Sequence, residues 1–217
     1  MAEREGLFIA LEGVGGSGKS TQIDGAKEYL ESRGFEVVAT REPGGVPEAE
    51  RIRKLIFSLG DEISPDHQVA LFFAARMFWV EDLLAPELKE GKLVLTDRTY
   101  TSTAAYQGFG RGADMGVIKN LADYILREHK PDGIILFDLD AKVAMERRTN
   151  NNDGDPFDEA EKEEWDKIVK GYRQMAWEDW GGLRWYVVDA SQPIEGVAKE
   201  VKGCLNMILE SKKNENI

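Results

Sequence analysis

Residues 13–20 of this chain read Gly-Val-Gly-Gly-Ser-Gly-Lys-Ser, and this stretch constrains the fold more than any other part of the sequence. The apolar run 7–11 precedes it, and a segment with apolar and small residues at helical spacing follows from residue 21. A glycine-rich turn between a strand and a helix lets successive backbone N–H groups point into one concavity, next to the positive end of the helix. The pattern G-x-x-x-x-G-K-[ST] in this setting predicts a loop that binds the phosphates of a nucleoside triphosphate.

Each position of this loop has an expected contact with the nucleotide. We expect Lys19 to reach the β- and γ-phosphates and the hydroxyl of Ser20 to bind Mg²⁺. The bland alternative is a glycine-rich turn without a ligand, but chance places the four fixed positions in such a chain only about once in a hundred. The predicted nucleotide-binding residues are Gly13, Val14, Gly15, Gly16, Ser17, Gly18, Lys19, Ser20 and Thr21.

Composition excludes several classes of function. The 217 residues carry a formal net charge of −12, which argues against a general binder of nucleic acids or membrane surfaces, because both need a basic surface. The single cysteine, Cys204, excludes an internal disulfide framework. No apolar run reaches transmembrane length, and residues 1–6 lack the features of a signal peptide. We therefore expect no nucleic-acid or membrane partner and a cytoplasmic location.

Strand-like and helix-like segments alternate along the whole chain. The predicted strands cover residues 7–11, 35–40, 92–96, 134–138 and 185–188. The predicted helices cover residues 21–33, 47–59, 64–90 with a kink or restart at Pro86, 101–107, 114–129, 141–148, 159–180 and a last segment that ends near 209. This alternation predicts an α/β fold with a parallel sheet and helices on both of its faces.

No repeat, linker or change of composition divides the chain, so we expect a single domain over residues 1–217. Three segments are predicted to be loosely held. Residues 150–156 have neither periodicity nor apolar residues, and the surrounding stretch 149–158 is predicted to be a flexible lid. Residues 108–112 contain three glycines and predict a mobile turn, and the polar residues 210–217 predict a frayed tail.

Asp97 and Arg98 end the third predicted strand. Open α/β sheets bind ligands at the carboxyl ends of their strands, so both side chains are expected near the glycine-rich loop. Asp97 could hold Mg²⁺ and hydrogen-bond Ser20, and the Arg98 guanidinium suits a second phosphate. The alternatives are a helix cap for Asp97 and a surface ion pair for Arg98.

Two helical segments offer groups that could recognise a nucleobase. Phe72 and Arg76 are four residues apart and share a helix face, which puts a stacking ring beside a forked donor. Ser102, Tyr106 and Gln107 have similar spacing on the next helix. An aromatic ring, a donor and an amide are what reading the edge of a base needs, although such aromatic residues more often belong to a core.

Taken together, these motifs resemble the thymidylate kinase family in their order and spacing. The resemblance rests on residues 8–20, 40–45, 71–76, 97–98, 102, 105–108 and 188–191, and it extends over nearly the whole chain. It implies a P-loop NTPase fold with a five-stranded parallel sheet and a short lid. It also implies that ATP with Mg²⁺ phosphorylates dTMP to dTDP, and that the protein is a homodimer.

The resemblance also implies individual roles. Phe72 would stack on thymine, Arg76 would contact the base, Ser102 and Gln107 would help to read it, and Tyr106 would crowd the 2′ position of the sugar. The remaining acceptor residues would be Arg98 and Arg53 at the phosphate, with Glu42 and Pro43 shaping the site. Adenine would lie between Arg147 and the loop Asp189, Ala190, Ser191 and Gln192.

Two departures from the family pattern bear on mechanism. The family usually carries a carboxylate in the P-loop where this chain has Gly15, and residues 149–158 contain no arginine. Arginines that reach a transferring phosphate contribute about 10³–10⁵ in rate in other enzymes. We therefore hypothesise that Arg147 or Arg148 takes this role, with Arg111 as a further candidate. The predicted catalytic set is Lys19, Asp97, Arg98, Arg147 and Arg148.

Two alternatives stay open at this point. The missing carboxylate at Gly15 could signal a different acceptor, such as dUMP or a modified pyrimidine nucleotide. The arginine-poor lid would permit a weakly active module that only binds ATP. Against the second alternative, a sensor of ATP has no reason to retain an acceptor pocket.

Overall fold

The computed structural model describes residues 6–149 and 161–215 of the chain. Its five strands form one parallel sheet in the order β2-β3-β1-β4-β5. This confirms the prediction of an α/β fold with a five-stranded parallel sheet. The strands are β1 (Leu7–Glu12), β2 (Val37–Arg41), β3 (Leu93–Asp97), β4 (Gly133–Asp138) and β5 (Trp185–Asp189).

Helices follow the strands as the periodicity predicts. The α-helices are α1 (Lys19–Ser32), α2 (Pro47–Leu59), α3 (Pro65–Trp79), α4 (Ala85–Lys89), α5 (Tyr100–Thr103), α6 (Met115–Leu126), α7 (Ala141–Thr149), α8 (Lys162–Trp177) and α9 (Ile194–Glu215). Short 3-10 segments are η1 (Gly60–Glu62) and η5 (Trp180–Gly182), and π-helical segments are η2 (Val80–Leu84) and η3 (Ala104–Gly110). In the parts of the chain that the structure describes, no helix is long and apolar enough to cross a membrane.

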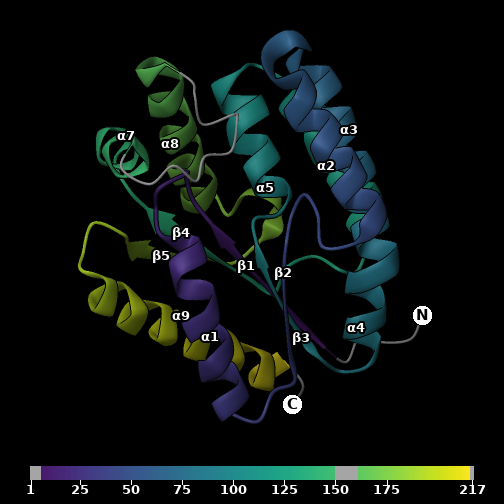
Figure 1. The fold of residues 1–217 in the computed structure, drawn as a ribbon. Helices are drawn as coiled ribbons and strands as arrows, with labels where there is room; N and C mark the ends of the chain where they lie inside the picture. The colour runs from purple at the N-terminus through teal and green to yellow at the C-terminus, as the bar shows by residue number, and fades with distance from the viewer. Residues whose placement is uncertain (1–5, 150–160, 216–217) are drawn as a thin grey trace.

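Helices cover both faces of the sheet, so its central strands are apolar up to their carboxyl ends. Figure 1 shows α1 and α9 together on one face, while α3, α4, α5 and α8 lie on the other. Residues 8–11 of β1 and 134–137 of β4 are buried, as expected for strands that are covered on both sides.

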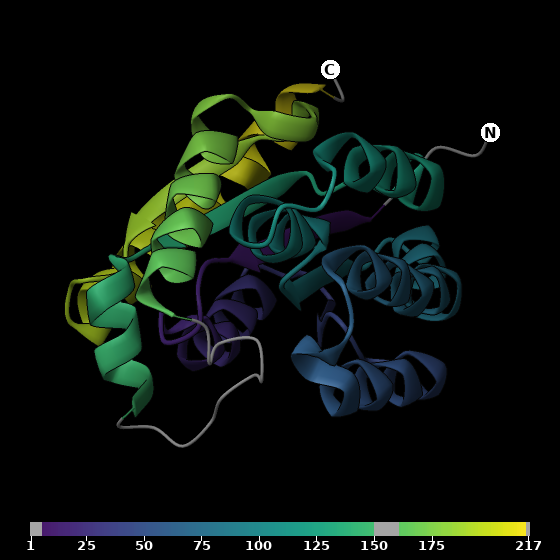
Figure 2. The same ribbon diagram turned by 90° about the horizontal axis from the view of Figure 1, so that it is seen from above.

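The carboxyl ends of the parallel strands all lie on one side of the sheet, and this side is referred to below as its carboxyl edge. Seen from above in Figure 2, α7 and α8 (green) stand on one side of this edge and α2 and α3 (blue) on the other. The teal segment that contains α5 and η3 lies between them. The loops after β1, β2, β3 and β5 therefore reach a common region.

The prediction of a mobile turn at residues 108–112 is wrong for residues 108–110. Residues through Gly110 belong to the π-helical η3, and both Gly108 and Gly110 are buried. A Cβ at Gly108 would collide with Sδ of Met115, and one at Gly110 would lie 2.9 Å from Ile168. These glycines therefore permit close helix packing, which their sequence neighbours cannot reveal.

The end of the chain also differs from the prediction. Helix α9 continues to Glu215, although we expected a frayed tail from residue 210. Lys212 accounts for part of this difference, because its Nζ lies 2.9 Å from Oδ1 of Asp132 and ties the last turns of α9 to the loop before β4. Helix α8 ends at Trp177, earlier than the predicted residue 180. Of the predicted lid 149–158, Thr149 ends α7 and the rest lies outside the described residues.

Candidate active site

The P-loop, residues 13–20, joins β1 to α1 as predicted. Lys19 is the first residue of α1, and its side chain is buried. Its Nζ donates to the carbonyl oxygens of Gly13 (2.8 Å) and Val14 (3.0 Å) and to Oγ of Ser17 (3.3 Å). These contacts hold the ammonium at the loop, where phosphate oxygens can replace its carbonyl partners.

Close packing explains two of the loop glycines. Gly13 has a φ of 143°, and a Cβ there would lie 2.7 Å from the carbonyl oxygen of Phe137. Gly16 has a φ of 75°, and a Cβ there would lie 2.6 Å from the carbonyl oxygen of Ala144. The loop therefore lies directly against β4 and α7, and only glycine fits at these two positions.

Ser20 and Asp97 meet beside the P-loop as predicted. Strands β1 and β3 are neighbours with Leu11 opposite Asp97, and Oγ of Ser20 donates to Oδ2 of Asp97 at 3.0 Å. Oδ1 of Asp97 is buried and accepts no hydrogen bond from a described residue. A free carboxylate oxygen beside a hydroxyl fits Mg²⁺, which proteins bind through one or two carboxylates together with phosphates and water. Within the described ranges, no three His, Cys, Asp or Glu residues group as a metal site of their own.

A pocket of about 370 Å³, its open mouth included, lies between the loop after β2, one face of α3 and the segment after β3. Every predicted acceptor residue except Arg53 lines it. Arg53 instead donates its Nη1 to the carbonyl oxygen of Pro43 at 3.0 Å and so supports the wall of the pocket. The lining residues are Glu42, Pro43, Phe72, Arg76, Arg98, Thr99, Ser102, Thr103, Tyr106 and Gln107.

Glu42 and Arg76 form a buried ion pair at the side of this pocket. Nε of Arg76 lies 2.6 Å from Oε2 of Glu42, and both side chains are almost fully buried. Burial raises the pKa of Glu42, and the positive charge of Arg76 opposes that rise. Nη1 of Arg76 is also buried and donates to no described residue. Because Arg76 also lines the pocket, its guanidinium keeps one donor that no described residue uses.

Arg98 joins the pocket to the P-loop. Its Nη1 donates to the carbonyl oxygen of Gly13 (3.0 Å) and to Oγ of Ser102 (3.1 Å), and its Nη2 donates to the hydroxyl of Tyr106 (3.3 Å). The same hydroxyl accepts from the backbone N–H of Gly15 at 3.1 Å. The backbone of Arg98 has a φ of 74°, a left-handed conformation that non-glycine residues keep only where neighbouring contacts hold it.

Glu12, to which the sequence analysis assigns no role, is the centre of a buried network under Arg98. Its Oε1 accepts from the backbone N–H groups of Thr99 (2.8 Å) and Ser102 (3.1 Å) and from Oγ1 of Thr101 (2.6 Å). Its Oε2 accepts from Oγ of Ser102 (2.6 Å) and from the hydroxyl of Tyr172 (2.9 Å). Burial raises the pKa of Tyr172 well above its usual range, so it stays a donor. The only sequence signal for Glu12 is a carboxylate that ends an apolar strand.

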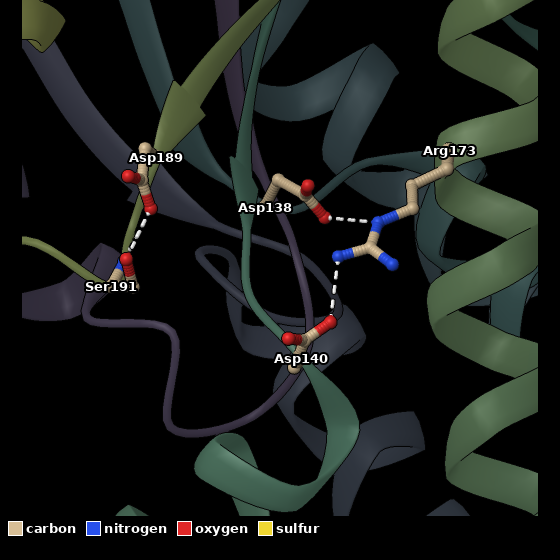
Figure 3. A network of polar contacts seen from close by, with 5 residues as sticks. All are labelled: Asp138, Asp140, Arg173, Asp189 and Ser191. Carbon is tan, nitrogen blue, oxygen red and sulfur yellow. Dashed lines mark hydrogen bonds and ion pairs between the residues drawn. The ribbon is translucent and has the colours of Figure 1, made fainter.

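The predicted adenine-side residues gather around the loop after β5. Oδ1 of Asp189 accepts from the backbone N–H (2.9 Å) and Oγ (2.6 Å) of Ser191, as Figure 3 shows, and these bonds lower the pKa of Asp189. Arg147 of α7 donates its Nη1 to the carbonyl oxygen of Ala190 at 2.8 Å and its Nη2 to that of Ser191 at 3.5 Å. Gln192 follows in the same loop. Gly16 of the P-loop also lies against α7, the helix that carries Arg147. The loop after β5 and the P-loop are therefore both in contact with this helix.

A second charged group at this edge is absent from the sequence prediction. Arg173 of α8 reaches between two carboxylates, with Nε 2.8 Å from Oδ1 of Asp138 and Nη2 2.9 Å from Oδ1 of Asp140 (Figure 3). The hydrogen bonds to both carboxylates raise the pKa of Arg173. The triad fastens α8 to the end of β4, because one guanidinium binds both acids.

The candidates for a phosphate-binding arginine are thus separated in space. Arg148 is half-buried near the end of α7, at the base of the predicted lid. Arg111 lies on the acceptor side, where its Nη1 is 2.8 Å from Oδ1 of Asp61 and donates to Oε1 of Gln68 at 2.9 Å. Arg111 is therefore committed to the surroundings of the acceptor pocket.

Comparisons with known proteins agree with this geometry. The family model for thymidylate kinase matches residues 11–201. A thymidylate kinase from Pseudomonas fluorescens (strain SBW25) is 38% identical over 206 residues, which cover 94% of this chain and 97% of the relative. One from Halothermothrix orenii is 38% identical over 207 residues, covering 92% and 98%. The crystal structure of thymidylate kinase from Ehrlichia chaffeensis superposes with a TM-score of 0.74 at 29% identity, covering 93% of this chain and 98% of that one.

Proposed function

The chain belongs to the thymidylate kinase family, and from this membership and the pocket beside its P-loop we propose that it transfers the γ-phosphoryl group of ATP to dTMP. The products are dTDP and ADP, so the enzyme contributes to the synthesis of pyrimidine deoxynucleotides. The family membership supports a nucleotide kinase, and the retained acceptor pocket disfavours a module that only binds ATP.

The contact between Arg98 and Gly13 carries this proposal. A single guanidinium donates both to the P-loop and to the wall of the pocket, so it lies where a donor phosphate and an acceptor phosphate would meet. Arginine suits this position because its planar fork can bind two oxygens of one phosphate. The Glu12 network fixes the backbone that follows Arg98 and its side-chain partner Ser102 beforehand, which lowers the cost of ordering Arg98 when the substrate binds.

The nucleoside of dTMP would lie at the other end of the pocket. The ring of Phe72 offers a face for stacking, and Nη1 of Arg76 offers a donor to the base. Tyr106 lies between the base end and Arg98, where its ring would crowd a 2′ hydroxyl and favour deoxyribose. Glu42 and Pro43 close the side of the pocket, with Arg53 behind them.

The proposed transfer requires positioning and charge compensation more than covalent chemistry. The phosphate oxygen of dTMP would attack the γ-phosphorus of ATP in line, held by Arg98 on one side and by the P-loop on the other. Lys19 would exchange its bonds to Gly13 and Val14 for phosphate oxygens. Ser20 and the free oxygen of Asp97 would hold Mg²⁺, which when bound neutralises charge on the phosphates.

The adenine of ATP is proposed to lie against Arg147 and the loop 189–192. Both carbonyl contacts of Arg147 go to this loop, so its guanidinium is held beside the proposed base site. This favours a role in binding ATP for Arg147 and leaves Arg148 as the better candidate for contact with the transferring phosphate.

We also propose a homodimer, as the family resemblance implies, and a cytoplasmic location. Helices α3 and α6 pack against each other, and both expose large apolar side chains: Met77 and Phe78 on α3, and Val117 and Tyr124 on α6. Exposed apolar side chains of this size support an interface between copies. Light scattering with size-exclusion chromatography would test it, and a monomer at micromolar concentration would contradict it.

An acceptor panel tests the proposed activity. ADP formation would be measured with ATP, Mg²⁺ and each of dTMP, dUMP, dCMP, dAMP and dGMP. We expect release with dTMP to exceed that with every other acceptor. A preference for dUMP would favour another pyrimidine deoxynucleotide, and release that no acceptor stimulates would contradict the kinase proposal.

A further inference from the structure

The Gln107 amide at the pocket is hydrogen-bonded to a second glutamine, Gln68 of α3. Gln68 is fully buried, and its Nε2 donates to the carbonyl oxygen of Gly60 at 2.8 Å. Its Oε1 accepts from Nε2 of Gln107 (3.2 Å) and from Nη1 of Arg111 (2.9 Å). Gln107 is also buried and lines the pocket. A chain of amides therefore runs from the backbone of η1 to the acceptor pocket.

The two outer partners fix the direction of this chain. A backbone carbonyl can only accept a hydrogen bond, and a guanidinium can only donate one. Gln68 must therefore turn its Nε2 toward Gly60 and its Oε1 toward Arg111. With the amide reversed, Oε1 of Gln68 would face the carbonyl oxygen of Gly60, and its Nε2 would face the donors of Gln107 and Arg111. Such mismatched groups are costly in a buried site. Arg111 itself is held by Asp61 at 2.8 Å.

The direction of Gln68 then decides the direction of Gln107. Because Oε1 of Gln68 is an acceptor, Gln107 presents its Nε2 to it, and the carbonyl edge of Gln107 is the part left for the pocket. Oε1 of Gln107 accepts no hydrogen bond from any residue in the described ranges. The wall of the pocket thus holds an acceptor from Gln107 and, from Arg76, a guanidinium whose Nη1 has no hydrogen-bond partner among the described residues.

This pair of groups matches only one type of pyrimidine edge. A 4-oxo pyrimidine has a donor at N3 and an acceptor at O4, whereas a 4-amino pyrimidine has an acceptor at N3 and a donor at N4. We infer that Gln68 is a positioning residue for base specificity, which makes the pocket select 4-oxo over 4-amino pyrimidine nucleotides without touching the base. The inference rests on the proposed kinase function and adds to it how one edge of the base is read.

Three acceptors separate this role from general damage to the pocket. 5-Methyl-dCMP differs from dTMP only at positions 3 and 4 of the ring, and dUMP differs from dTMP only by the methyl group. We would measure kcat/KM for each acceptor at saturating ATP in the wild type and in two variants. Gln68→Met removes both hydrogen-bonding groups, and Gln68→Glu keeps the acceptor that faces Gln107 and Arg111.

In Gln68→Met the Gln107 amide is free to rotate, so we expect the preference for dTMP over 5-methyl-dCMP to fall roughly ten-fold, mainly through KM. The preference for dTMP over dUMP should change by less than about two-fold, because the amide does not read the methyl group. Gln68→Glu should keep the first preference within about three-fold of the wild type. These ratios do not depend on the fraction of each preparation that is folded.

A structural role alone would lower all three values of kcat/KM together. An unchanged preference in Gln68→Met, or an equal loss in Gln68→Glu, would overturn the inference. If Gln68→Met does not fold, Arg111→Met removes one of the two donors that hold Gln68 and should lower the same preference to a smaller extent, and no loss there would likewise overturn it. A wild type without dTMP-dependent ADP formation would instead overturn the proposed function.

Discussion

The hydroxyl of Tyr106 accepts a hydrogen bond from the backbone N–H of Gly15, with 3.1 Å between the nitrogen and the oxygen. A side chain of the acceptor pocket therefore touches the P-loop at Gly15, the position at which the sequence resemblance leads us to expect a carboxylate. Arg98 donates to the same hydroxyl at 3.3 Å. The two halves of the site are thus joined through one phenol oxygen.

Tyr106→Phe removes the acceptor of both bonds. We expect kcat/KM for dTMP to fall roughly ten-fold, because the backbone N–H of Gly15 and the guanidinium of Arg98 each lose one acceptor, while KM for ATP changes by less than about two-fold. Steady-state kinetics with each substrate varied in turn measures this. Tyr29→Phe is a matched control, because its hydroxyl bonds to Asn206 and Arg33 away from the pocket, and it should leave both constants unchanged. A larger effect on ATP than on dTMP would contradict the prediction.

Gly15→Asp restores a carboxylate next to the Tyr106 hydroxyl. We expect KM for dTMP to change by about three-fold or more and KM for ATP by less than about two-fold, because the new charge faces the acceptor side. Gly25→Asp is the control for added charge, since Gly25 is exposed on α1 and a Cβ there meets no atom within 4 Å. Equal changes for both substrates would count against this reading of the loop.

Arg147 and Arg148 should have separable effects. Arg147→Ala frees the loop after β5, so we expect KM for ATP to rise roughly ten-fold with a smaller change in kcat. Arg148→Ala should lower kcat about a hundred-fold if Arg148 compensates charge during transfer. Fixed-time assays of ADP formation, with both substrates at saturating concentrations, measure kcat.

The control for both variants is Arg51→Ala, which removes an exposed arginine of α2. If Arg147→Ala and Arg148→Ala both leave kcat within about three-fold of the wild type, neither arginine contacts the transferring phosphate. The catalytic arginine would then have to be sought elsewhere, with Arg173 as the next variant to test.

Arg76→Ala leaves Glu42 buried without its partner. We expect a loss of about 3–5 kcal/mol in the free energy of unfolding near neutral pH, measured by urea denaturation. Burial already raises the pKa of Glu42, and loss of Arg76 raises it further. The folded variant therefore binds a proton more tightly than the unfolded chain does, and its stability falls as the pH rises through the pKa of folded Glu42.

The difference between wild type and Arg76→Ala should thus be smaller at pH 5 than at pH 8. Adding Glu42→Gln to Arg76→Ala provides the control, because a neutral amide does not titrate and should remove most of this pH dependence. A deficit in Arg76→Ala that is the same at both pH values would show that the buried charge of Glu42 is not its cause.

Asp97→Asn tests the assignment of the metal ligand. An amide can still accept from Ser20 but binds Mg²⁺ more weakly, so the Mg²⁺ concentration that gives half the maximal rate should rise roughly ten-fold or more. Asp66→Asn, on the exposed first turn of α3, should leave it unchanged. An unaltered Mg²⁺ requirement in Asp97→Asn would remove Asp97 from the metal site.

The sequence predicts those parts of the molecule that depend on local patterns. The apolar run of β1 and the spacing of Lys19 and Ser20 act within a few residues, and the structure has each where the pattern puts it. Phe72 and Arg76 lie together in the pocket because helical spacing places them on one face.

The unpredicted features depend on partners that are far away in the chain. Glu12 bonds to Tyr172 across 160 positions, and Gln68 bonds to Gln107 across 39. Gly108 has to be glycine because a Cβ there would collide with Met115, which packs against it. A single sequence shows the polarity of such residues but not their partners, so it cannot separate an exposed glutamine or glutamate from a buried, bonded one.

The position of the pocket residues along the chain has a consequence for how such an enzyme can change its acceptor. Every lining residue of the acceptor pocket comes from residues 42–107, one continuous stretch that the chain inserts between β1 and β4. The P-loop and the loop after β5 lie outside this stretch. Exchange of a single gene segment would therefore replace the acceptor pocket together with Asp97. Such a cassette keeps the ATP-binding machinery intact only where it carries an aspartate at the end of β3 that meets Ser20 and still fits Tyr172 and Gly15.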